Sequence, residues 1–159
     1  MKTRIALCLA AAALAGCATQ GDVGGDKTSA KAGRGEKSAA RASGAITLEG
    51  YKRDVAQRIS QNNSAKVYSG RPQALLRSVV VLRYVVDGRG NLVKSEIVRS
   101  NHDRETEAAA LASLRNSAPF PQPATHLLRQ GKLEISETWL FNNDGRFQLR
   151  TIAEPQMDG

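Results

Sequence analysis

The sequence predicts an α+β domain in which a small antiparallel sheet of three or four strands packs against two helices. Two observations predict this class. The periodic segments follow the order helix, strand, strand, helix, strand, strand, and turn clusters rich in Gly, Asn and Asp separate the members of each strand pair. This order suits an antiparallel sheet with both helices on one of its faces.

The first helix is expected from Leu48 to about Asn62. Its apolar residues recur at intervals of 3, 4 and 4 positions, which places them on one helical face. These residues are Leu48, Tyr51, Val55 and Ile59. Mostly charged and amide side chains occupy the opposite face, so the helix should bury one side only.

The strongest strand signal runs from Ser78 to Val86, where β-branched residues dominate. One of its two faces consists of Val80, Leu82, Tyr84 and Val86. A turn at residues 87–91 contains two glycines, and a second strand from Leu92 to Arg99 should pair back antiparallel. The alternation of this second strand is imperfect, which indicates a β-bulge.

A second helix should follow, capped by Asn101 or Asp103 and ended by Pro119. Its expected apolar face consists of Ala108, Leu111, Leu114 and Ala118. A third strand, residues 133–141, alternates apolar and polar residues but is interrupted by Glu137. A hairpin turn at residues 143–145 and a short strand, residues 146–151, complete the predicted domain.

The first sixteen residues are typical of an export signal, because Lys2 and Arg4 precede an uncharged run too short to span a membrane. The sequence Leu14-Ala15-Gly16-Cys17 resembles the lipobox of bacterial lipoproteins. That resemblance implies that Cys17 becomes the lipidated N-terminus, with acyl chains such as palmitate, and that Ala18 favours the outer membrane. The alternative is an ordinary export signal with a chance cysteine.

The rest of the predicted organisation follows from composition. Residues 17–45 form a flexible tether poor in large apolar side chains, residues 46–152 the domain, and residues 153–159 a tail. Cys8 lies in the signal, so no disulfide is expected. The formal charge is +8 for the whole chain and +6 without the signal. A basic exported protein is expected to meet anionic lipid or acidic protein patches rather than nucleic acid.

The ordered motifs of the domain resemble the C-terminal domain of the TonB/TolA family of periplasmic proteins. The resemblance rests on Tyr51, Val55 and Ile59, on residues 80–87, on Gly90, on Ile97-Val98-Arg99-Ser100, on Ala109-Ala110-Leu111 and on Ala118-Pro119-Phe120-Pro121-Gln122-Pro123. It implies a non-catalytic module that binds a peptide of an outer-membrane receptor by adding a strand to its sheet.

Three departures from that family bear on function. The chain has no N-terminal transmembrane helix and no long rigid linker, and Ser69 and Ser78 replace a common proline and glycine. We therefore expect a lipid-anchored module that binds an envelope protein, such as an outer-membrane receptor, without a motor of its own. The alternatives are a structural accessory lipoprotein of an envelope complex and a TonB-type energy transducer in transport.

Catalytic chemistry has few candidates in this sequence. Neither His102 nor His126 lies in a cluster with metal-ligand spacing, and His102-Asp103 with Glu105 is more simply a solvated helix start. Ser100 lacks the setting of a nucleophile elbow. We therefore expect no enzyme activity, metal or cofactor. Partner contacts are assigned to Leu133, Ile135, Trp139 and Phe141, for which core packing is the competing interpretation.

Overall fold

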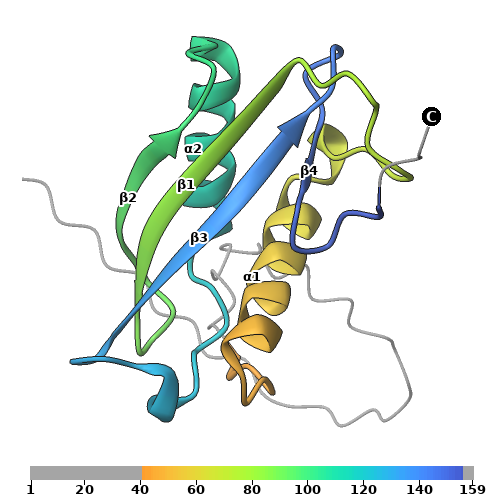
Figure 1. Cartoon of the computed structure of the whole chain (residues 1–159). Coiled ribbons are helices and arrows are strands. Elements are labelled where there is room, and N and C mark those ends of the chain that lie inside the picture. The colour runs from red at the N-terminus through yellow and green to blue at the C-terminus, as the bar shows by residue number, and fades with distance from the viewer. Residues whose placement is uncertain (1–40, 156–159) are drawn as a thin grey trace, which may run out of the picture. The chain divides into compact units, whose positions relative to one another are not determined.

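The structure is a computed structural model that describes residues 41–155 (Figure 1). Its elements in chain order are α1 (Leu48–Asn62), η1 (Ser64–Lys66), β1 (Ser78–Asp87), β2 (Leu92–Arg99), α2 (Arg104–Ser117), η2 (Thr125–Leu127), β3 (Lys132–Phe141) and β4 (Phe147–Leu149). The strands form one antiparallel sheet in the order β2-β1-β3-β4. The predicted α+β class is therefore confirmed.

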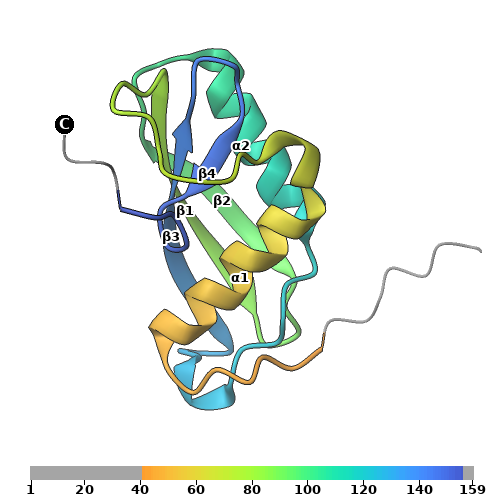
Figure 2. The ribbon, with the colours of Figure 1, turned by 90° about the vertical axis from the view of Figure 1, so that its right-hand side faces the viewer.

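The core lies between the sheet and the two helices, which cover the same face of the sheet (Figure 2). The central strand β1 contributes the buried face that the sequence predicts, Val80, Leu82, Tyr84 and Val86. Strand β3 pairs with β1 in unbroken register, from Ser78 opposite Phe141 to Asp87 opposite Lys132. These two strands form the centre of the sheet, and β2 and β4 pair to them at its two edges.

Helix α1 begins at an N-cap, because the Oγ1 of Thr47 accepts a hydrogen bond from the backbone N–H of Gly50 at 3.1 Å. Its buried residues are Tyr51, Val55, Ala56 and Ile59. The prediction that Leu48 shares this face is wrong, since Leu48 is 40% exposed. The buried seam begins one turn later and includes Ala56, which allows the helix to approach the sheet closely.

Helix α2 buries a face that matches the predicted one only in part, since Leu114 is buried and Leu111 and Ala118 pack partly buried against the core. Ala108 is exposed, whereas the buried residues are Thr106, Ala110, Ser113, Leu114 and Ser117. The hydroxyls of this face are satisfied locally: Ser113 Oγ donates to Ala110 O at 2.8 Å, and Ser117 Oγ donates to Ser113 O at 2.7 Å. Small residues with internally bonded hydroxyls can therefore form a packed face that an apolar periodicity does not detect.

Asp103, one of the two predicted caps, begins α2 by accepting hydrogen bonds from the backbone N–H groups of Glu105 and Thr106. The turn between β1 and β2 contains Gly90 at φ 85°. Strand β2 has the predicted irregularity, because its register with β1 shifts twice and leaves Val98 and Val93 unpaired.

The described chain begins within the predicted tether, and residues 41–45 lie against the domain. Ser43 N donates to Gln122 O, and Gln122 N donates to Arg41 O, both at 2.9 Å. The folded part thus includes residues that the sequence assigned to the tether. The predicted signal, Cys17 and most of the tether lie outside the described residues.

Candidate functional site

The backbone of β3 determines where this sheet can accept another strand. In an antiparallel ladder, both polar groups of a residue point to the same side, and consecutive residues alternate. Arg150 N donates to Thr138 O, and Asn142 N donates to Arg146 O, both at 2.9 Å. Thr138 and Asn142 therefore turn away from β1, and by the same alternation so do residues 134 and 136.

Part of this outward side of β3 is unoccupied. Strand β4 pairs only with residues 139–141 at the end of β3, as Figure 1 shows. At the start of β3, Arg129 and Lys132 exchange two backbone hydrogen bonds, at 2.8 and 3.0 Å. Between these points, no backbone hydrogen bond or β-bridge of residues 41–155 reaches the outward groups of Glu134 and Ser136. We call this stretch, residues 134–136, the open edge.

Glu137 lies where the pairing of β3 with β4 ends. Its carboxylate Oε1 accepts hydrogen bonds from Thr138 N at 2.7 Å and from Thr151 N at 3.3 Å. A continued ladder would instead direct the N–H of Thr138 to Arg150. The side chain of Glu137 is only 4% exposed, and this burial raises the pKa of its carboxyl, although hydrogen bonds from Thr151 and Thr138 oppose the rise.

A polar hollow of about 390 Å³ lies where the open edge meets the end of the β3–β4 pairing. Its cations are Lys52 and Arg53 from α1 and Arg150 from the segment after β4. Ser136 and Glu137 also line it, so it is continuous with the open edge. We call it the basic hollow. Its residues come from distant parts of the sequence, and none of the sequence motifs indicates that they meet.

The other end of the sheet, strand β2, is less suited to strand addition. Its two register shifts, at Val93 and Val98, interrupt the regular spacing of outward backbone groups. Bulges of this kind are a common way to protect an edge strand from pairing with another chain. Of the two sides of the sheet, β3 therefore offers the more regular backbone.

The outer edge of β4 is covered by residues 67–70. Tyr68 N donates to Phe147 O at 3.3 Å, and the side-chain amide of Gln148 donates to Tyr68 O at 3.0 Å and also to Gly70 O. Both amide hydrogens of Gln148 are thereby used, so its Oε1 is fixed on the opposite side. Strand β4 is consequently closed to a partner, unlike the open edge of β3.

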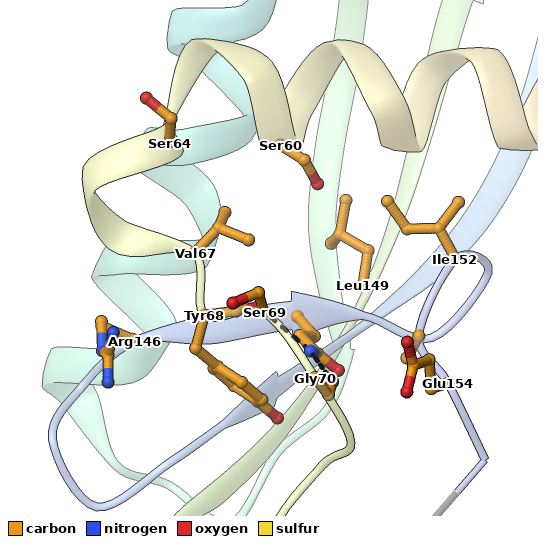
Figure 3. Close-up of a pocket in the computed structure, with 12 residues that line it drawn as sticks. Ser60, Ser64, Val67, Tyr68, Ser69, Gly70, Arg146, Leu149, Ile152 and Glu154 are labelled. Carbon is orange, nitrogen blue, oxygen red and sulfur yellow. Dashed lines mark hydrogen bonds between the residues drawn. The ribbon is translucent and has the colours of Figure 1, made fainter.

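A second hollow, of about 520 Å³, lies between the end of α1 and this covered edge (Figure 3). Figure 3 shows Arg146 and Glu154 at opposite ends of the hollow, with Leu149 between them. Among the described residues, the buried atoms Ser60 Oγ, Tyr68 Oη and Gln148 Oε1 have no hydrogen-bond partner. These atoms expose almost no surface, so the hollow presents mainly apolar side chains and two rim charges.

The four residues assigned to partner contacts all lie on the core face of β3. Leu133 is 7% exposed, Ile135 is 3% exposed, and Trp139 and Phe141 are fully buried. Trp139 also donates its indole N–H to Ser113 Oγ at 2.9 Å. The structure brings these side chains together as core, so a contact with a partner through them stays a prediction. The residues between them, Glu134 and Ser136, are exposed, and their outward backbone groups are unpaired among the described residues.

The candidate catalytic residues are placed in separate local networks. Asp103 and Glu105 pair with Arg77, at 2.9 and 2.5 Å. Ser100 Oγ donates to Glu107, and a ring nitrogen of His126 lies 2.7 Å from Ile46 O. Within residues 41–155, no group of three or more His, Cys, Asp and Glu side chains is arranged to hold a metal ion.

Glu137 is the residue whose position in the sequence indicates this part of β3, although the alternation of the strand alone assigns it no role. Glu137 interrupts an otherwise apolar face, and an acidic residue at such a position has to be bonded or exposed. The cations of the basic hollow carry no comparable signal, because nothing in the sequence links α1 to the residues after β4.

Comparison of the chain with protein-family models, with characterised proteins and with solved structures finds no match. The resemblance to the TonB/TolA domain therefore stays a prediction, carried by the sequence motifs alone. No helix in the described part of the chain is long and apolar enough to cross a membrane.

Proposed function

We propose that this chain is a lipid-anchored, TonB/TolA-like binding module of the cell envelope, which takes an extended segment of a partner protein onto the open edge of β3. The observation that carries the proposal is the outward backbone N–H and C=O groups of Glu134 and Ser136, which are unbonded among the described residues and lie on a strand held in regular register by β1. Main-chain hydrogen bonds of this kind are how extended peptides add to sheets.

Three further features support strand addition at this place. Strand β4 stops after three residues, residues 67–70 cover its outer edge, and β2 is irregular. Within residues 41–155, the sheet therefore has one regular stretch left for a partner. The lipobox at Cys17 supports a location on the periplasmic face of the envelope, in the outer membrane, and a receptor of that membrane is the partner class that the motif resemblance implies.

A proline scan of the two edges tests this proposal. Ser136→Pro removes a backbone N–H that points away from β1, so the ladder to β1 should survive. Ser136→Ala removes the same hydroxyl but keeps the N–H, and Ser95→Pro places the matched change on β2. The three variants and the wild type are compared as baits for detergent-solubilised envelope, after circular dichroism has shown that each is folded.

Strand addition at β3 predicts a partner that is retained by Ser136→Ala and Ser95→Pro and lost only with Ser136→Pro. Retention by all folded variants would refute strand addition and favour the accessory role, in which a helical or loop surface makes the contact. Loss with Ser95→Pro alone would assign the binding edge to β2 and overturn the choice of β3.

A further inference from the structure

The basic hollow has a charge arrangement that the open edge itself does not explain. Lys52 pairs with Glu49 at 3.5 Å, whereas Arg53 and Arg150 have no ion pair among the described residues. The carboxylate of Glu137, the other acid of the hollow, is buried and bonded to backbone N–H groups. The hollow therefore carries cationic side chains in excess of the acids that could neutralise them.

The position of the hollow makes this excess relevant to a partner strand. The hollow begins at Ser136, the last residue of the open edge, and Arg150 stands where the chain leaves β4. Arg53 approaches from α1, while Arg150 lies across from Thr138 on the sheet. A strand added at the open edge has one end in this hollow, whichever direction it runs.

We propose that the partner segment carries an acidic side chain at the end that enters the basic hollow, where Arg53 and Arg150 receive its carboxylate. This inference rests on the proposed strand addition and names the chemistry of its partner. A carboxylate there would lie between two cations that lack ion-pair partners among the described residues, would neutralise one of their two charges, and would fix the register of a short strand. A flat anionic lipid surface fits less well than the end of an extended chain, because these cations line a concave site.

Synthetic strands provide the probe for this inference. Each is a capped seven-residue peptide of alternating Thr and Val, N-methylated at alternate residues so that only one of its edges can pair. Glu, Gln or Lys is placed at either the first or the last position, since the direction of the added strand is open. Dissociation constants are measured by fluorescence anisotropy at low and at high salt.

We expect one of the two Glu peptides to bind about 3- to 10-fold more tightly than its Gln counterpart, the range that one or two half-exposed charge pairs supply. The Lys peptide should bind more weakly than Gln, and high salt should reduce both differences. In the double variant Arg53→Gln, Arg150→Gln the preference should fall below about twofold. The matched control, Arg89→Gln with Arg104→Gln, removes the same charge outside the hollow and should keep the preference.

The outcomes separate this inference from the proposed function. Equal binding of all peptides that is abolished by Ser136→Pro would overturn the acidic preference and leave strand addition in place. No binding of any peptide would contradict strand addition and the preference together. Binding to vesicles containing phosphatidylglycerol that needs Arg53 and Arg150, without a preference for Glu peptides, would assign the hollow to lipid and overturn the inference.

Discussion

Gly90 is the position at which this fold should tolerate a side chain least. It lies in the turn between β1 and β2 with φ at 85°, in the left-handed region that L-residues with a Cβ rarely adopt. A Cβ placed on it would lie 2.0 Å from the carbonyl oxygen of Phe120. That carbonyl cannot simply move away, because Phe120 N donates a hydrogen bond to Gly90 O at 2.8 Å.

Two costs therefore combine in Gly90→Ala. The left-handed conformation costs about 1–2 kcal/mol for a residue with a Cβ, and forcing atoms into a packed contact costs about 1–3 kcal/mol. The free energy of unfolding should fall by about 2–5 kcal/mol, a large part of the stability of a typical domain. At about 4 °C per kcal/mol, the melting temperature should fall by about 8–20 °C.

Gly131→Ala is the matched control. Gly131 has φ at 74°, and a Cβ placed on it would meet no atom within 4 Å, so this variant carries only the conformational cost. Urea unfolding of both variants and the wild type gives the two free energies directly. The difference between the variants is the cost of the contact with Phe120. If Gly90→Ala and Gly131→Ala lose the same stability within about 0.5 kcal/mol, the tight approach of the turn to Phe120 is refuted.

Three further predictions concern buried or capping polar groups. Burial holds the pKa of Glu137 above its unfolded value of about 4.3, so the fold favours the protonated form. The wild type should therefore lose stability relative to Glu137→Gln as the pH rises from 4 to 7. Urea unfolding at both pH values measures this, and the opposite trend would contradict it. Ser113→Ala should cost about 1–3 kcal/mol, because it leaves the buried indole N–H of Trp139 unbonded, and a loss under about 0.5 kcal/mol in the same assay would exclude that bond. Asp103→Ala should cost about 1–2 kcal/mol, since it removes the cap and the ion pair with Arg77. It should also speed hydrogen exchange in the first turn of α2 rather than in the last turn, and equal effects at both ends would reject the capping role.

Much of this fold could be predicted because its signals are local. The alternation of β1 requires neighbouring residues only, and its buried face, Val80 to Val86, matches the structure. The cap at Asp103 and the turn at Gly90 likewise follow from residues within a few positions. The predicted face of α2 is right at Leu114 but misses Ser113 and Ser117. These two bury their hydroxyls through bonds to nearby carbonyls, which a pattern of apolar residues does not register.

The candidate site was less predictable, because it depends on pairings between distant segments. The aromatic and aliphatic character of β3 favours partner contacts through these side chains, yet they are buried, and the outward backbone groups of Glu134 and Ser136 are the ones left unpaired by the described residues. Whether these groups are free depends on how far β4 extends, and its pairing with β3 ends beside Glu137, whose carboxylate accepts hydrogen bonds from Thr138 N and Thr151 N. No single segment contains that information.

The shortness of the open edge limits how tightly it can hold a partner. Glu134 and Ser136 offer four backbone groups, and at about 0.5–1.5 kcal/mol for each hydrogen bond they contribute about 2–6 kcal/mol. Joining two free molecules costs about 4–15 kcal/mol, so a freely diffusing peptide needs further contacts, such as those in the basic hollow, and should still bind only weakly. Two proteins confined to one membrane surface meet at a much higher effective concentration, which offsets much of that cost. The proposed lipid at Cys17 would therefore raise the apparent affinity for a partner in the same membrane. The same domain released from its membrane should bind that partner only transiently.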